Sequence, residues 1–163
     1  HVDKYLGDCA MILFGVPDPD SNHLSNAVYC ALLIHRVIER VNRDRLEHGD
    51  VAVSFSAGVN AGPMLAGNMG SRSRMEYTVV GDTVNTASRL AAISGPGEII
   101  VTEAVAKNIN IARQFETTEV NAVKLKGKKN PITVYRIDKG NEETEHKLDR
   151  DLGIILSAVE SGE

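Results

Sequence analysis

Asn85 and Arg89 stand four residues apart in the segment GDTVNTASRL, residues 81–90, which begins with a glycine and looks like a helix start. Residues at this spacing lie on one face of a helix, so the amide and the guanidinium would project from the same rigid element. Phosphoryl transfer needs such donors, because a guanidinium stabilises phosphate charge and an amide can orient a sugar. A solvated arginine and a helix-start asparagine are the alternative interpretation, and the pair alone does not exclude it.

Three other charged residues lie where turns or strands are expected. Asp8 follows a glycine at a predicted hairpin turn, so it is either a turn former or an oxygen ligand for Mg²⁺ or Mn²⁺. Lys126 lies in KLKGKKN, residues 124–130, which is either a solvated loop or, with Gly127 allowing close backbone approach, a site for a triphosphate. Lys4 could equally be an exposed strand charge. Which alternative holds for each residue depends on the elements that lie beside it.

Hydrophobic periodicity predicts the elements that position these residues. A strand pair opens the chain, and a long amphipathic helix follows, capped by Asp20, Ser21 or Asn22 and extending to about residue 48. A second helix spans 82–93 and is stopped by the glycines and proline of 95–97. Strands are expected at 51–62, 75–80, 98–102, 112–120, 122–128 and 132–137, with a glycine-rich arm around 67–74 and a short helix at 103–109.

This order of elements predicts an α+β fold, a ferredoxin-like sandwich in which helices cover one face of a mainly antiparallel sheet. The predicted catalytic or binding domain is 1–137. Residues 138–163 hold eight acidic and three basic residues, a net charge of −5, and form an acidic C-terminal tail. Apolar residues at helical spacing predict that this tail forms a terminal or linking helix: Leu148, Leu152, Ile155 and Val159.

Composition narrows the class of protein. The chain has 163 residues, 42% hydrophobic and 25% charged, with a net charge of −4, which is typical of one soluble domain. It has no run of about 18 apolar residues and no signal-peptide pattern, so we expect a cytoplasmic location. The charge balance predicts no nucleic-acid partner. Cys9 and Cys30 are interpreted as reduced core residues, and the histidines at 23, 35 and 48 as surface or capping residues.

Taken together, three segments resemble the catalytic domain of class III nucleotide cyclases, the adenylyl and guanylyl cyclase family: KYLGDCAMILFG, GVNAGPMLAGNMGSRSRMEYTVVGDTVNTASRL and LKGKKNPITVYRI. The resemblance covers about residues 2–137, and its anchor segments have family-like order and spacing. It implies that Asp8 is the second of two metal-binding aspartates. It also implies that Lys4 and Thr78 recognise the purine, with Thr78 standing where many adenylyl cyclases have Asp, as in a bacterial subgroup.

The remaining candidates also match family positions. Asn85 resembles the ribose-orienting asparagine, Arg89 the transition-state arginine and Lys126 the triphosphate-binding lysine. The implied activity is adenylyl cyclase: conversion of ATP to 3′,5′-cyclic AMP and pyrophosphate with two Mg²⁺ or Mn²⁺ ions. The implied assembly is a homodimer in which each chain supplies Asp8 to one site and the other residues to its partner's site.

One departure from the family pattern concerns the metal. The segment that carries the first metal aspartate in the family lies upstream of the first hairpin and is absent from this chain. We therefore expect half a metal site and weak activity unless the parent protein supplies the missing segment. We also expect the parent protein to have an upstream regulatory or membrane-anchoring domain. Two other functions remain open: a degenerate cyclase-like nucleotide-binding or dimerisation module, and a guanylyl cyclase, which Lys4 and Thr78 oppose.

Overall fold

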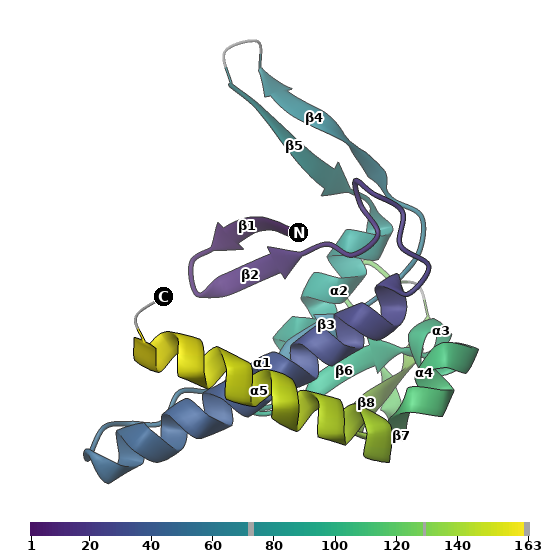
Figure 1. Ribbon diagram of the computed structural model, residues 1–163. Helices are drawn as coiled ribbons and strands as arrows, with labels where there is room; N and C mark the ends of the chain where they lie inside the picture. Colours follow the sequence, from purple (N-terminus) through teal and green to yellow (C-terminus); the bar gives the residue numbers. More distant parts are fainter. Residues whose placement is uncertain (72–73, 129, 162–163) are drawn as a thin grey trace.

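The computed structural model describes residues 1–161 apart from 72–73 and 129, and Figure 1 shows its arrangement. Its elements, in chain order, are β1 (Val2–Leu6), β2 (Cys9–Ile12), α1 (His23–Glu47), β3 (Ala57–Val59), β4 (Leu65–Ser71), β5 (Arg74–Val80), α2 (Asp82–Ile93), β6 (Ile99–Thr102), α3 (Glu103–Ala106), α4 (Ile109–Gln114), β7 (Phe115–Val123), β8 (Ile132–Gly140) and α5 (Glu142–Ser161). The predicted α+β class is confirmed.

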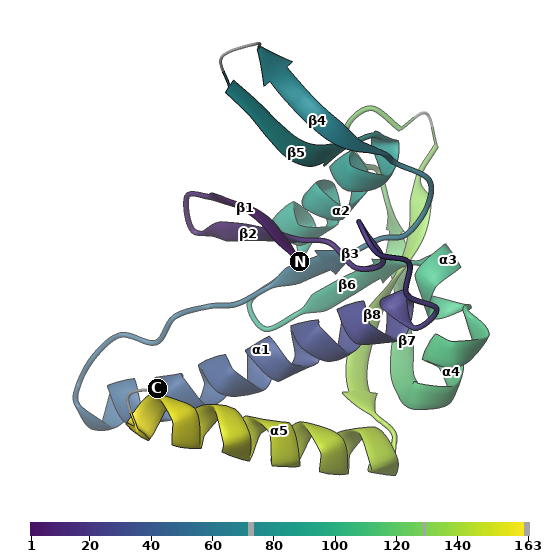
Figure 2. The same ribbon diagram turned by 45° about the horizontal axis from the view of Figure 1, so that its top comes forward.

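A four-stranded sheet with the order β3-β6-β8-β7 forms the centre of the molecule. β3 runs parallel to β6, whereas β8 is antiparallel to both β6 and β7. β1 pairs with β2, and β4 with β5, in two separate antiparallel hairpins. Figures 1 and 2 both show the β4–β5 hairpin, called the arm below, extending away from the layered body. The predicted arm therefore exists, although residues 72–73 at its tip lie outside the described residues.

Alternating residues of β6 divide the core into two layers. Ile99 and Val101 are buried in a cluster with α1, α3, α4 and α5, whereas Ile100 is buried with Leu90 of α2 and Leu125. Because successive strand residues point to opposite faces, α2 covers one face of the sheet and the other helices cover the opposite face. The expectation that helices cover only one face is wrong in this respect.

Helix α1 begins where the sequence predicted, and of the three predicted capping residues it is Asp20 whose side chain makes the bonds. Asn22 at the N-cap makes no side-chain cap bond. Instead, the Asp20 carboxylate accepts from the backbone N–H of Asn22 at 2.8 Å and from the Asn26 amide at 2.8 Å. His23 bonds the Asp20 carbonyl at 2.7 Å, and His48 bonds the Asp44 carbonyl at 2.7 Å beyond the helix end. These two histidines therefore hold helix termini.

From Glu142 the predicted tail forms helix α5, which lies alongside α1 in both views (Figures 1 and 2), whereas residues 138–140 complete strand β8. Leu148 is fully buried in the larger core cluster. At the helix surface, the Tyr29 hydroxyl donates to the Asp151 carboxylate at 2.8 Å. An ion pair joins Arg36 to Glu145 at 2.6 Å. The tail is thus a helix packed against the body, although Val159 in its predicted apolar stripe is exposed.

Several predicted strands are shorter or absent. Residues 51–56 form no strand, although the Gly97 N–H donates to the Phe55 carbonyl at 2.7 Å just before β6. Asn42 and Arg45 of α1 bond the backbone of this segment, at Val53 and Val51. The predicted strands at 112–120 and 122–128 are one strand, β7, which starts at Phe115 because 112–114 belong to α4. After Val123 the chain turns, with Lys128 N–H bonded to the Leu125 carbonyl at 3.1 Å.

The two cysteines differ from the sequence prediction. Cys9 is exposed, because the β1–β2 hairpin is a separate sheet and its strands are largely uncovered in the single chain. Cys30 on α1 is half-buried, and burial raises the pKa of its thiol. The prediction of a core position is therefore wrong for Cys9. Both thiols are free rather than joined in a disulfide.

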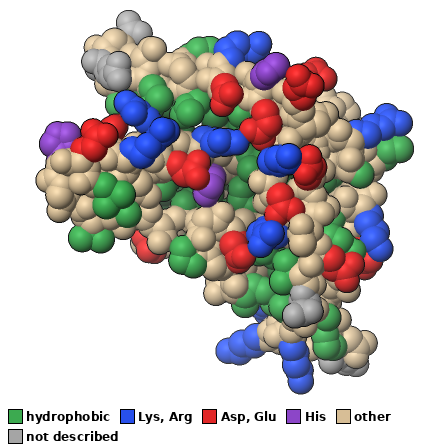
Figure 3. All heavy atoms as spheres, turned by 90° about the horizontal axis from the view of Figure 1, so that it is seen from below, with side chains coloured by type: hydrophobic (Ala, Val, Ile, Leu, Met, Phe, Trp, Pro, Cys, Tyr) green, Lys and Arg blue, Asp and Glu red, His purple; other side chains and the backbone are tan. Residues whose placement is uncertain are grey.

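Two observations concern the surface. Within the described ranges, no helix has both the length and the apolar character needed to cross a membrane. Figure 3 shows acidic and basic side chains intermixed over the face seen from below Figure 1.

Candidate active site

Helix α2, which carries Asn85 and Arg89, lies directly against strand β3. A Cβ atom added at Gly58 would stand 2.3 Å from the Ala87 carbonyl oxygen and 2.3 Å from the Ala91 nitrogen. No side chain fits in that space, so glycine allows the helix backbone to touch the strand backbone. This contact fixes the depth of α2 on the sheet and hence the position of its outer face.

Polar side chains fix the first turn of α2. The Asn60 amide donates to the Thr83 carbonyl at 3.0 Å, and its oxygen accepts from the Thr102 hydroxyl at 2.8 Å. The Thr83 hydroxyl donates to the Pro63 carbonyl at 2.7 Å. The start of the helix is therefore tied to the ends of β3 and β6 and to the chain leading into the arm. The predicted bounds 82–93 are confirmed.

The loop between β7 and β8 lies on the outer face of α2. The Arg89 guanidinium approaches Gly127 so closely that a Cβ there would lie 3.4 Å from Nη2. Lys128 forms an ion pair with Asp82 at the start of the helix. Leu125 is buried beneath the loop. Lys126 is exposed between these anchored positions.

This arrangement brings three sequence-predicted residues to one helix-and-loop surface. Asn85 is exposed on α2, Arg89 is half-buried one turn later, and Lys126 directly precedes the glycine that contacts Arg89. An amide, a guanidinium and an ammonium on one rigid surface can all donate to anionic oxygens and sugar hydroxyls. The surface is therefore suited to a phosphorylated ligand. Lys126 is exposed, as in a solvated loop, while Gly127 and Lys128 contact α2, so the two interpretations of this loop both stay open here.

A second group of residues joins the first hairpin to the arm. The Thr78 hydroxyl of β5 donates to Oδ2 of Asp3 at 3.0 Å, and the Lys4 ammonium lies 3.3 Å from the same oxygen. The Asp3 side chain is 0% exposed, whereas that of Lys4 is 32% exposed. Asp3, Lys4 and Thr78, called the Asp3 cluster below, thus bring the two predicted purine-recognising residues together across two hairpins.

Asp3 is a residue that the sequence analysis did not single out. In a regular strand, neighbours point to opposite faces, so Asp3 and Lys4 would be separated. The β1–β2 register shifts between Val2 and Lys4, however, and this irregularity accompanies the contact of the Lys4 ammonium with its neighbour's carboxylate. No pattern in the sequence predicts such a register shift.

Asp8 is exposed in the turn between β1 and β2, as its turn-forming interpretation predicted. Among the described residues, no group of three or more His, Cys, Asp or Glu side chains is placed to hold a metal ion. Asp8 therefore offers a single carboxylate, which alone is too few ligands for a divalent cation.

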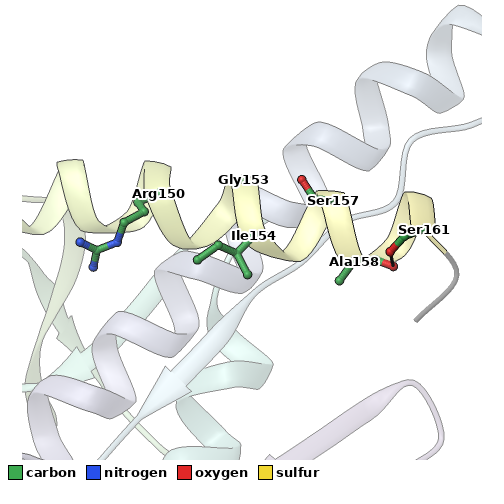
Figure 4. Close-up of a pocket in the computed structure, with 6 residues that line it drawn as sticks. All are labelled: Arg150, Gly153, Ile154, Ser157, Ala158 and Ser161. Carbon is green, nitrogen blue, oxygen red and sulfur yellow. Dashed lines mark hydrogen bonds between the residues drawn. The ribbon is translucent and has the colours of Figure 1, made fainter.

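A surface hollow elsewhere on the molecule is unrelated to these residues. Figure 4 shows that its lining comes from one helix, α5, and that no candidate residue takes part: Arg150, Gly153, Ile154, Ser157, Ala158 and Ser161. A single helix face without a facing element does not enclose a ligand.

A sequence profile of the adenylate and guanylate cyclase catalytic domain matches residues 3–139, a range that includes every candidate residue from Lys4 to Lys126. The chain belongs to this cyclase family. An adenylate cyclase from Anabaena cylindrica is 31% identical to the cyclase domain over 143 residues, which are 83% of this chain and 28% of that protein. The chain therefore spans little more than a quarter of that relative.

Solved structures agree with this assignment. The adenylyl cyclase CyaB from P. aeruginosa has a TM-score of 0.80 at 26% identity, over 86% of this chain and 72% of that one. The guanylate cyclase domain of RhGC from Catenaria anguillulae, in complex with GTP, has a TM-score of 0.76 at 27% identity, over 86% and 73%. Cyclases named for either purine share the fold of this cyclase domain, so the fold does not select between ATP and GTP.

Proposed function

We propose that this cyclase domain is an adenylyl cyclase, which converts ATP to 3′,5′-cyclic AMP and pyrophosphate. The observation that carries the proposal is the Asp3 cluster, in which Lys4 and Thr78 from two hairpins share one carboxylate oxygen. An ammonium only donates hydrogen bonds, so it suits the acceptor N1 of adenine and opposes the N1–H donor of guanine. The Thr78 hydroxyl can accept from the adenine amino group.

The surface of α2 and the adjoining loop supplies the other functions. Arg89 donates to the oxygens of the α-phosphoryl group, where charge develops as the ribose 3′-hydroxyl attacks and pyrophosphate departs. Asn85 holds the ribose so that the attack is in line. Lys126 binds the triphosphate as a point charge. The Gly127 contact supports this assignment because it brings the guanidinium beside the loop that carries the lysine.

The family depends on metal ions, and we propose two Mg²⁺ or Mn²⁺ ions per site. Such ions, when bound, lower the pKa of a hydroxyl and neutralise phosphate charge. Asp8 is an exposed oxygen donor of the kind that these ions prefer, but as a lone carboxylate it does not complete a site among the described residues. We therefore assign Asp8 as one ligand and assign the reaction steps only to the residues described above.

We propose that the site is shared between two copies of the chain in a homodimer. Both hairpins expose large apolar side chains, including Tyr5 at 74% and Leu65 at 67% exposed, together with Leu6, Met75 and Tyr77. A monomer seldom leaves so many on one pair of neighbouring elements, which supports an interface there. Each chain would give Asp8 to one site and Lys4, Thr78, Asn85, Arg89 and Lys126 to the other.

We propose that the cyclase domain acts in the cytoplasm, attached to an upstream regulatory or membrane domain. Neither a degenerate regulatory module nor a guanylyl cyclase is favoured. A degenerate module would be favoured by the loss of the polar residues that serve catalysis in the family, but this chain has all three: Asn85, Arg89 and Lys126. A guanylyl cyclase is opposed because Lys4 and Thr78 suit adenine.

The test uses the purified full-length protein with Mn²⁺ or Mg²⁺ and either ATP or GTP, and quantifies cyclic AMP, cyclic GMP and pyrophosphate. Arg89→Ala is expected to lower cyclic AMP formation by about 100-fold, as expected for loss of a transition-state donor. The matched control is Arg43→Ala, at an exposed arginine of α1, which is expected to keep wild-type activity. A folded dimer that forms no cyclic nucleotide would contradict the proposal and favour a regulatory module.

A further inference from the structure

The Asp3 carboxylate is fully buried, yet it does not face a set of donors that would explain its burial. Its Oδ2 atom contacts Lys4 and Thr78, whereas Oδ1 has no hydrogen-bond donor among the described residues. A buried carboxylate with one unpartnered oxygen is costly. Among the described residues, the side chains that it contacts are those of the two proposed purine-recognising residues.

The hydrogen bond from Thr78 to Asp3 decides which way the hydroxyl can act. A hydroxyl has one proton to donate and two lone pairs that accept. An ionised carboxylate only accepts, so the Thr78 proton points towards Asp3 across the 3.0 Å contact. The remaining lone pairs of the Thr78 oxygen can then only accept from a ligand.

Adenine and guanine differ at the group that this oxygen would meet. Adenine carries an amino group at C6, which donates, whereas guanine carries a carbonyl oxygen, which accepts. A freely rotating hydroxyl could satisfy either group. A hydroxyl whose proton is held by a carboxylate accepts from adenine and places two acceptors face to face with guanine.

We propose that Asp3 is a positioning residue that sets purine selectivity by holding the Thr78 proton and the Lys4 ammonium. With this carboxylate behind it, Thr78 acts as the acceptor that an aspartate provides directly in other adenylyl cyclases. Asp3 itself does not touch the purine, because its side chain is fully covered. This inference rests on the proposed adenylyl cyclase function and deepens it.

The first variant is Asp3→Asn in the full-length protein. The asparagine amide can donate to Thr78, so the hydroxyl proton becomes free to point at guanine. We measure kcat/KM for ATP and GTP, and separately the displacement of a fluorescent ATP analogue by each nucleotide. The ratio of ATP to GTP is expected to fall about tenfold in both measurements, the order of one hydrogen bond. A purely structural role would lower both nucleotides equally.

Substitutions at Thr78 provide matched controls. Thr78→Ser keeps the hydroxyl and is expected to keep the ratio, whereas Thr78→Val removes the hydroxyl and is expected to lower it about tenfold. Combining Asp3→Asn with Thr78→Val is expected to change the ratio no further, because both act through one oxygen. Adding Thr78→Asp to Asp3→Asn is expected to restore the preference for ATP, since a carboxylate then meets the amino group directly.

The outcomes separate this inference from the function that it rests on. If cyclic AMP forms and Asp3→Asn leaves the ratio unchanged, the inference is wrong and the adenylyl cyclase proposal stands. If no cyclic nucleotide forms at all, the enzymatic proposal fails, while the displacement ratio still tests Asp3. If circular dichroism shows that Asp3→Asn does not fold, the Thr78→Val and Thr78→Ser pair decides, and an unchanged ratio in Thr78→Val overturns the inference.

Discussion

The guanidinium of Arg89 on α2 lies against Gly127 in the loop between β7 and β8, at a distance where a Cβ atom would be 3.4 Å from Nη2. Gly127 has a φ of +81°, a backbone conformation that side chains rarely adopt. The loop therefore depends on glycine for its turn, and its backbone lies within van der Waals reach of the arginine. This one contact couples the proposed transition-state residue to the segment that carries Lys126.

Gly127→Ala is expected to lower kcat severalfold, because a side chain at this positive φ strains the loop and shifts it relative to Arg89, which the methyl group would only touch at van der Waals distance. The positive φ adds a cost of about 1 kcal/mol to folding. The matched control is Gly49→Ala, at φ +79° with no atom within 4 Å, which bears the same strain far from the site. Steady-state kinetics and urea unfolding of both variants separate the two effects. Equal activity in both variants would show that the contact has no catalytic role.

Gly58→Ala tests how α2 is held on the sheet. The added methyl group would meet backbone atoms of Ala87 and Ala91 at 2.3 Å, and backbone cannot yield as a side chain can. The free energy of unfolding is expected to fall by about 3 kcal/mol or more. Gly153→Ala on α5, with nothing within 4 Å, is expected to raise it by about 1 kcal/mol instead. Urea denaturation measures both, and a mild effect at Gly58 would mean that α2 can shift.

Local patterns in the sequence were sufficient to predict most of the elements. The bounds of α2 are as predicted because apolar spacing, a preceding glycine and the Gly95–Gly97 stop all agree. Of the strand expected at 51–62, only β3 at Ala57–Val59 forms. Residues 51–56 bond to side chains of α1 and, at the Phe55 carbonyl, to the backbone N–H of Gly97, and not to a neighbouring strand. Periodicity reports a tendency to form a strand and carries no information about the neighbouring strand.

The contacts within the site were less accessible from sequence. Residue types and spacing singled out Lys4, Asn85, Arg89 and Lys126, whereas Thr78 and the individual roles came from the family resemblance. The grouping of these residues into two surfaces follows only from the fold. Asp3 was missed because its role depends on a register shift in β1 and on a hydrogen bond to a residue 75 positions away. Cys9 was wrongly placed in the core because an apolar strand need not be covered within one chain.

The proposed roles of Lys4 and Thr78 in purine recognition lead to a prediction about specificity. Replacing Lys4 with Glu and Thr78 with Cys together is expected to move the preference from ATP towards GTP, because a carboxylate accepts from the N1–H of guanine. Initial rates of cyclic AMP and cyclic GMP formation at equal nucleotide concentrations measure the change. Arg43→Ala serves again as the unaffected control. Undiminished activity of the double variant on ATP would mean that these residues do not recognise the base.

The hydrogen bond between Tyr29 and Asp151 predicts how pH acts on the packing of α5. Burial, reinforced by the bond to Asp151, raises the pKa of the Tyr29 phenol, whereas the bond from Tyr29 lowers the pKa of the Asp151 carboxyl. Because this pKa is raised, the folded state binds the phenol proton more tightly than the unfolded state does. Its stabilising effect is therefore lost as the pH rises above the ordinary tyrosine value of about 10. A lowered carboxyl pKa stabilises the fold above its ordinary value of about 3.9, and that contribution is lost as the pH falls further.

Tyr29→Phe is therefore expected to lower the thermal midpoint by a few degrees at neutral pH and to reduce the further loss of stability above pH of about 10. Asp151→Asn is expected to reduce the loss at acid pH, since no carboxylate remains there to take up a proton. A double-mutant cycle of the two substitutions measures their coupling. Suppose that the two substitutions have additive effects on stability and that Tyr29→Phe loses as much stability at alkaline pH as the wild type. The bond then does not hold α5 against α1 in solution.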